Sequence, residues 1–143
     1  MAPSDIPEHI LEGWTVLIVD DEHDSLELAR YLLEFYGAKV FTAVDGTEGL
    51  QKTLTIMPRF IISDISMPVM DGWEFVQKVK TNPKLASIPV IALTAHAMTG
   101  DRERALGMGF HNYLTKPLTA ETFMSDLIRL LAEIPEFAEA LQR

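Results

Sequence analysis

The sequence predicts an α/β fold in which five parallel strands form one doubly wound sheet with helices on both faces. Short apolar runs of four or five residues alternate along the chain with longer segments of helical periodicity. The runs are almost continuously apolar, which is typical of strands covered on both faces. Right-handed crossovers between parallel strands then place helices on both sides of the sheet.

Five segments have the length and composition of buried strands, and each is followed by enough chain for a helix. Together they predict five successive βα units. The predicted strands are Val16–Val19, Lys39–Ala43, Phe60–Ser63, Val90–Leu93 and Asn112–Thr115.

Helices are predicted by apolar stripes and by capping patterns. Each of two stripes, one after the first strand and one near the C-terminus, falls on a single helical face: Leu26, Ala29, Leu33 and Tyr36, then Phe123, Leu127, Leu130 and Ile134. Three further helix starts are marked by an N-cap aspartate with a glutamate three positions on. These pairs are Asp24 with Glu27, Asp45 with Glu48 and Asp71 with Glu74, and Thr119 is the expected cap of the last helix.

Length and composition are those of one compact domain. The chain has 143 residues, of which 48% are hydrophobic, so it can bury a sizeable core. We expect a lead-in over residues 1–13, the domain over 14–134, and a short tail over 135–143 that follows a break at Pro135. No internal repeat or linker is present.

Charge and cysteine content exclude several classes of function. The net charge of −9 disfavours direct binding to nucleic acid, which needs clustered Lys and Arg. No apolar run approaches the length of a membrane span, and the N-terminus lacks the pattern of a signal peptide. Because the chain has no cysteine, it has neither disulfides nor thiolate metal sites, and the cytoplasm is the expected compartment. The four histidines, His96 among them, lack metal-ligand spacing.

Charged side chains stand at the ends of three predicted strands. Asp20 and Asp21 follow the first strand, Asp64 follows the third, and Lys116 follows the fifth. Open parallel sheets place their functional sites at the carboxyl ends of the strands. Three carboxylates and a lysine at that edge predict a site for a metal ion and a phosphoryl group.

Phosphoryl transfer requires a nucleophile, a cation that neutralises the transferred oxygens, and fixed donors. We expect Asp64 to be the nucleophile, which forms an acyl phosphate. Hard oxygen ligands select Mg²⁺ or Mn²⁺, and Asp21 and Asp64 are the expected direct ligands. Lys116 supplies a positive charge for the phosphoryl group, and the Thr94 hydroxyl can donate a hydrogen bond to it.

The same residues resemble the receiver domains of two-component response regulators over roughly residues 14 to 132. The resemblance rests on motifs that occur in one order, each at a strand end. These motifs are Asp20-Asp21, Asp64 with Met67-Pro68 and Met70-Asp71-Gly72 after it, Thr94-Ala95, and Tyr113-Leu114-Thr115-Lys116-Pro117. The resemblance implies a flavodoxin-like sheet of order 2-1-3-4-5, which makes strands 1 and 3 neighbours.

The resemblance also implies roles for individual residues. The backbone carbonyl of Ser66 would complete the metal ligands, and Asp20 would act mainly through water. A cis peptide before Pro117 would aim Lys116 inward. Thr94 and Tyr113 would form a switch that reshapes the surface made by helix 4, strand 5 and helix 5.

The implied partners are a sensor histidine kinase or a phosphotransfer protein as phosphoryl donor, and a downstream protein or a second copy of the chain. The implied chemistry is self-catalysed phosphotransfer with slow autodephosphorylation, not enzymatic turnover. Met1 and the lead-in favour a single-domain regulator of the chemotaxis type, and a receiver excised from a hybrid histidine kinase or a larger regulator is the alternative.

Other interpretations stay open on the residues alone. Seen singly, an acidic pair after a strand is a cap or a turn, and Lys-Pro is a turn. A phosphatase with an aspartyl nucleophile would also use Asp, Mg²⁺ and Lys, but its usual second acid is replaced here by Ser66. A receiver-like module that is never phosphorylated would be expected to have lost Asp64, Lys116 or the acidic pair, and all are present.

Overall fold

The computed structural model describes residues 6–95 and 101–142, and His96 lies outside this part of the chain. Five parallel strands form one sheet in the order β2-β1-β3-β4-β5, as the sequence and the resemblance predicted. The strands are β1 (Thr15–Val19), β2 (Lys39–Ala43), β3 (Phe60–Asp64), β4 (Val90–Thr94) and β5 (Asn112–Thr115). The helices are α1 (His23–Phe35), α2 (Gly46–Ile56), α3 (Gly72–Thr81), α4 (Asp101–Met108), α5 (Phe123–Leu131) and α6 (Pro135–Leu141).

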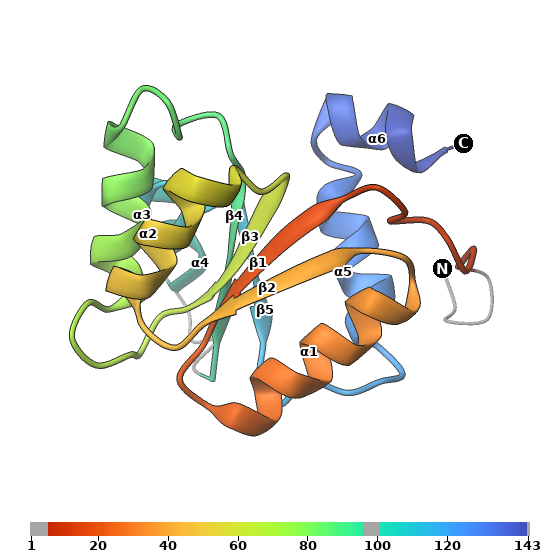
Figure 1. The fold of residues 1–143 in the computed structure, drawn as a ribbon, viewed down its shortest axis with the longest axis horizontal. Coiled ribbons are helices and arrows are strands. Elements are labelled where there is room, and N and C mark those ends of the chain that lie inside the picture. Colours follow the sequence, from red (N-terminus) through yellow and green to blue (C-terminus); the bar gives the residue numbers. More distant parts are fainter. Residues whose placement is uncertain (1–5, 96–100, 143) are drawn as a thin grey trace.

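The helices cover both faces of the sheet, with α1 and α5 on one face and α2, α3 and α4 on the other (Figure 1). β1 pairs with β2 on one side and with β3 on the other, so that Val19 lies opposite both Ala43 and Ser63. The strand order therefore reverses at β1, and the edge beyond the carboxyl ends of β1 and β3 is the switch point of the fold.

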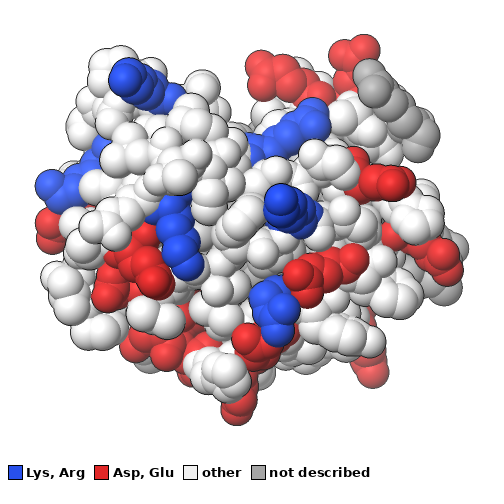
Figure 2. Space-filling model, in the orientation of Figure 1, with Lys and Arg blue, Asp and Glu red and all other residues white. Residues whose placement is uncertain are grey.

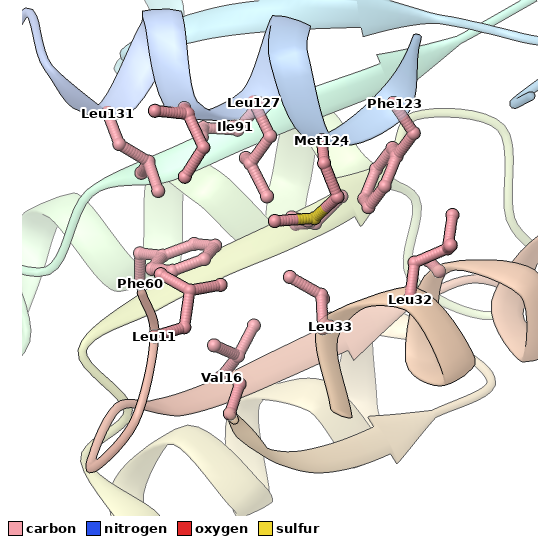
Figure 3. Close-up of a cluster of buried hydrophobic side chains, with 14 of the residues drawn as sticks. Leu11, Val16, Leu32, Leu33, Phe60, Ile91, Phe123, Met124, Leu127 and Leu131 are labelled. Atoms are coloured by element: carbon pink, nitrogen blue, oxygen red, sulfur yellow. The ribbon is translucent and has the colours of Figure 1, made fainter. Parts of the chain in front are cut away.

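The larger apolar cluster lies between the sheet and the pair α1 and α5. Figure 3 shows Met124 and Leu127 of α5 pointing toward Phe60 and Leu33 across this core. Phe60, Leu33 and Leu127 are fully buried. Because α5 buries almost its whole apolar stripe, it fixes the position of β5, the strand that precedes it.

The capping predictions are confirmed for two helices and are wrong for α1. The side chains of Asp45 and Asp71 accept hydrogen bonds from Glu48 N and Glu74 N, each at 2.9 Å. α1 begins at His23 with Glu22 as its N-cap, so Asp24 lies inside the first turn.

The start of α1 is set by Asp20, whose Oδ1 accepts the Glu22 backbone N–H at 2.9 Å. Thr119 is also not the cap residue of α5, which is Thr122. The Thr119 hydroxyl instead accepts from Thr122 N at 3.2 Å, in the turn before the helix.

Three strands extend one residue beyond their predicted bounds: β1 includes Thr15, β3 includes Asp64 and β4 includes Thr94. Asp64 and Thr94 are thus held in the sheet itself.

None of the described helices is both long enough and apolar enough to span a bilayer.

Candidate functional site

Four strand ends converge on one shallow depression of about 410 Å³. Asp20 directly follows β1, Asp64 ends β3, Thr94 ends β4 and Lys116 follows β5. The parallel sheet fixes these positions, since the Asp20 N–H continues the ladder to Ala43 O at 2.9 Å. The Lys116 N–H does the same to Thr94 O at 2.8 Å. The depression is lined by Asp21, Glu22, Asp64, Ser66, Thr94, Ala95 and Lys116.

Lys116 lies between two buried carboxylates. Its Nζ is 3.3 Å from both oxygens of Asp20 and 3.3 Å from Oδ2 of Asp64. The side chain of Lys116 is only 10% exposed, and the peptide bond to Pro117 is cis, as the resemblance implied. The ammonium therefore faces the site and not the solvent.

The Asp64 carboxylate is held by its own loop. Its Oδ1 accepts from Ile65 N at 2.8 Å and from Ser66 N at 3.4 Å, while Oδ2 faces Lys116. The loop folds back closely, because a Cβ added at Gly72 would lie 2.3 Å from Asp64 O. Only glycine fits where α3 begins against the end of β3.

Burial and neighbouring charges shift the pKa of three groups. Burial, and then the charge of Asp20, raise the pKa of Asp64 against the opposing effect of Lys116. Desolvation and the charge of Asp64 raise the pKa of Asp21. Desolvation by itself would lower the pKa of Lys116, but the carboxylates of Asp20 and Asp64 outweigh it and raise that pKa. The site therefore holds more negative charge than one lysine offsets.

Three carboxylates can act as ligands to one cation. Asp20, Asp21 and Asp64 each offer an oxygen, and these oxygens lie within 4.8 Å of one another. Among the described residues, Asp20 Oδ2 is buried and accepts no hydrogen bond of good geometry, although the Lys116 ammonium lies 3.3 Å from it as an ion-pair partner. A buried carboxylate oxygen with spare acceptor capacity in an all-oxygen set suits a hard divalent cation. Ser66 lines the same depression, where its backbone carbonyl is the further expected ligand.

Thr94 belongs to the site, whereas Tyr113 lies beside it. Thr94 is 9% exposed and also lines an adjoining cavity of about 210 Å³. Tyr113 is half-buried and borders that second cavity but not the depression around Asp64. The two cavities share Ser66 and Thr94, so the depression around Asp64 adjoins the cavity beside Tyr113.

Sequence reasoning missed two features of the site. Glu22 adds a fourth carboxylate, with Oε2 3.9 Å from Lys116 Nζ, and its position directly after Asp20-Asp21 was the available signal. Arg104 lies over the Trp73 ring at 4.2 Å from its centroid, and both line the cavity beside Tyr113. No spacing in the sequence indicated this pairing of α3 with α4.

The chain is similar in sequence to proteins of a known family. Residues 16–128 match the response regulator receiver domain family. Response regulator Rre1 of Synechocystis is 37% identical over 122 residues, which span 85% of this chain but 53% of that protein. The chain thus covers about half the length of this relative.

Solved structures agree with the sequence match. The chemotaxis response regulator CheY4 of Vibrio cholerae has 34% identity and a TM-score of 0.78, over 82% of this chain and 98% of that one. The receiver domain of the Pseudomonas aeruginosa sensor histidine kinase PA1611, described with a magnesium ion in its active site cleft, has 29% identity and a TM-score of 0.74. That match covers 85% of this chain and 96% of the other. By sequence, fold and site together, the chain belongs to the response regulator receiver domain family of two-component systems.

Proposed function

We propose that this receiver accepts a phosphoryl group on Asp64 from a phosphohistidine donor and signals through the phosphorylated form. The observation that carries the proposal is the position of Asp64 Oδ2, which is 3.3 Å from Lys116 Nζ at an open depression. The Asp64 carboxylate is held by its loop, lies next to the Lys116 ammonium, and lines a depression that is open to a phosphate-carrying donor.

In the transfer step, a carboxylate oxygen of Asp64 forms a bond to phosphorus as the bond from phosphorus to the donor's histidine nitrogen breaks. The electron pair of the broken bond returns to the imidazole. Lys116 would offset charge on the phosphoryl oxygens, and Thr94, which lines the same depression, would donate a hydrogen bond to them.

Asp20, Asp21, Asp64 and the carbonyl of Ser66 are the proposed holders of Mg²⁺ or Mn²⁺. The buried Oδ2 of Asp20, which accepts no hydrogen bond of good geometry, supports this assignment, as does the magnesium in the cleft of the similar PA1611 receiver. Bound there, a divalent cation supplies charge neutralisation for the incoming phosphoryl oxygens.

A sensor histidine kinase or a phosphotransfer protein is the proposed donor. Similar chains include segments of hybrid signal transduction histidine kinase D of Dictyostelium discoideum and of the signal transduction histidine-protein kinase BarA of Escherichia coli, which is consistent with a receiver used in a phosphorelay. The proposed output is a conformational switch through Thr94 and Tyr113 that alters the face formed by α4, β5 and α5, where a downstream protein or a second copy would bind. Autodephosphorylation is proposed to be slow because Ser66 stands where a phosphatase would have its second acid.

Intact-mass measurement after incubation with acetyl phosphate and Mg²⁺ tests the proposal. One added phosphate is expected on the native protein and none on Asp64→Asn. Asp71→Asn is the matched control, because Asp71 lies on the same loop but caps α3 and does not line the depression around Asp64. Undiminished labelling of Asp64→Asn would refute the assignment of the phosphoryl acceptor.

A further inference from the structure

We propose that the groove between the N-terminal lead-in and α6 is a docking site for a Lys- and Arg-bearing segment of a partner protein. The groove has a volume of about 520 Å³ and lies where the strands begin, away from the proposed phosphorylation site. Its lining includes Trp14, Arg59 and the four glutamates Glu8, Glu12, Glu136 and Glu139.

The two segments that form the groove are built into the fold. Trp14 packs edge-on against Phe137 of α6 at 4.9 Å between ring centroids and against Phe60 of β3 at 6.0 Å. Leu11 is fully buried, and Phe137 is 6% exposed. Residues 6–13 and α6 lie outside the segment that matches the receiver family, so most of the groove is formed by residues beyond that segment.

The rim of the groove is acidic and lacks internal partners. Glu8, Glu12, Glu136 and Glu139 are all exposed, and none makes an ion pair with another residue in the described ranges. Figure 2 shows acidic side chains gathered at the upper right, over the region where Figure 1 places α6. Four carboxylates around one concave surface create a negative potential that attracts cationic groups.

The one arginine that lines the groove is already engaged with aromatic rings. The Arg59 guanidinium lies 4.2 Å from the Trp14 ring centroid and 5.5 Å from that of Phe137. This stacking covers the apolar floor and holds Arg59 away from ion pairing with the glutamates. The apolar groups that stay accessible in the groove are those of Pro7, Ile10 and Ala140, on which the stems of long basic side chains can pack while their charges reach the rim.

A basic protein segment fits this groove better than an anionic partner. Nucleic acid and anionic membrane surfaces would face four glutamates against a single arginine. Each exposed ion pair contributes little alone, but several in one groove add up to a measurable affinity that falls with salt.

Docking here should be independent of the phosphoryl group. Arg59 directly precedes β3 and Asp64 ends it, which separates them by roughly 16 Å at about 3.3 Å per residue. That distance exceeds the Debye length of about 8 Å at physiological salt. The groove would hold the receiver on a partner whether or not Asp64 is modified.

Fluorescence anisotropy with a fluorescein-labelled Lys-Ala-Arg-Ala repeat peptide tests the proposal on the full chain. Glu12→Gln/Glu136→Gln/Glu139→Gln should bind about tenfold more weakly than the native protein, as expected for three lost exposed ion pairs. The control Glu74→Gln/Glu103→Gln/Glu121→Gln changes the net charge equally at exposed positions elsewhere and should bind like the native protein.

Further readouts separate groove binding from general attraction to an acidic protein. The indole N–H resonance of Trp14 should shift on titration with the peptide, and the affinity should not change with beryllofluoride. Equal weakening in the two triple variants, or perturbations centred on the Asp64 depression, would overturn the proposal. So would a dimer in sedimentation that the groove variant loses, because a second copy would then be the occupant.

Discussion

The ammonium of Lys116 is 3.3 Å from Oδ2 of Asp64 although the two residues come from β3 and the end of β5, with β4 between them. Lys116 reaches across the strand ends to sit between Asp64 and Asp20. One ammonium cannot balance these two carboxylates together with Asp21 and Glu22 beside them. The site thus carries residual negative charge, which is the physical basis of its expected affinity for a divalent cation.

Mg²⁺ is therefore expected to stabilise the unphosphorylated protein. A cation that binds only the folded state stabilises it by about 1.4 kcal/mol when its concentration is tenfold above Kd. Thermal unfolding with and without millimolar Mg²⁺ should show this shift in the native protein and little of it in Asp21→Ala. Asp24→Ala is the matched control, because Asp24 lies in the first turn of α1 and is not part of the carboxylate cluster. An unchanged melting temperature in the native protein would exclude the cation site.

Without metal, the contribution of Asp64 to the free energy of unfolding should fall as the pH rises. Folding raises the pKa of Asp64 by burial, so the folded state holds this proton more tightly than the unfolded state does. The resulting stabilisation is complete below the ordinary aspartate pKa of about 3.9 and is lost as pH rises through the raised value. Asp21, whose pKa is raised by desolvation and by Asp64, acts in the same direction.

Asp64→Asn removes the buried charge and keeps an oxygen to accept from Ile65 N, and Lys116 retains Asp20. In EDTA at pH 7 this variant should unfold at a higher urea concentration than the native protein, and the difference should shrink toward pH 4. The measurement is urea unfolding followed by circular dichroism. A native protein that is more stable than Asp64→Asn at pH 7 would contradict the sign of this effect.

The sequence predicted the strands and the charged residues at their ends because both are local patterns. Asp20, Asp64 and Lys116 each end an apolar run, and parallel strands bring such ends together. The cap of α1 was mispredicted because Asp24 has the right spacing to Glu27, while the backbone there is fixed by Asp20. Local spacing could not reveal that competing hydrogen bond.

Contacts between segments that are far apart in the sequence could not be predicted, because they depend on how the chain folds as a whole. Trp14 and Phe137 meet only because the lead-in and α6 fold over the same end of the sheet. The division into a lead-in at 1–13, a domain at 14–134 and a tail at 135–143 remains a prediction. The burial of Leu11 and Phe137 nevertheless shows that both flanking segments contribute to the core.

Gly72 is expected to be required for the geometry of the Asp64 loop. A Cβ at this position would lie 2.3 Å from Asp64 O and 2.7 Å from Ile65 Cα, and backbone atoms cannot move aside as a flexible side chain can. Gly72→Ala should cost about 1–3 kcal/mol of stability, as overpacking does, and should lower the rate of phosphorylation. Urea unfolding and intact-mass kinetics measure the two effects.

Gly107→Ala is the matched control for this substitution. Gly107 lies in α4, and an added Cβ would meet nothing within 4 Å. Alanine there should raise stability by about 0.5–1 kcal/mol through its higher helix propensity. Equal changes in stability and phosphorylation rate in Gly72→Ala and Gly107→Ala would show that the close contact of Gly72 with Asp64 does not determine the geometry of the loop.

We expect phosphorylation of Asp64 to act on the face formed by α4, β5 and α5 through Thr94 and Tyr113. A phosphoryl group on Asp64 offers new acceptor oxygens near Thr94, and the cavity shared by Thr94 and Tyr113 gives the tyrosine ring space to move inward. The coupling is a shift between two packings, so its size is limited by the differential affinity of the phosphoryl group for them.

Thr94→Ala should therefore still be phosphorylated on Asp64 but should transmit the change poorly to the surface around Tyr113. Beryllofluoride, which mimics the phosphoryl group, should shift the resonances of the Tyr113 region strongly in the native protein and weakly in Thr94→Ala. Thr115→Ala is the control, because Thr115 pairs with Thr94 across β4 and β5 but is exposed and lines neither the depression around Asp64 nor the cavity that Thr94 and Tyr113 share. Since Thr115→Ala leaves the Thr94 hydroxyl in place, it should respond like the native protein. Equal responses in all three proteins would rule out this route and leave the phosphorylation site untouched.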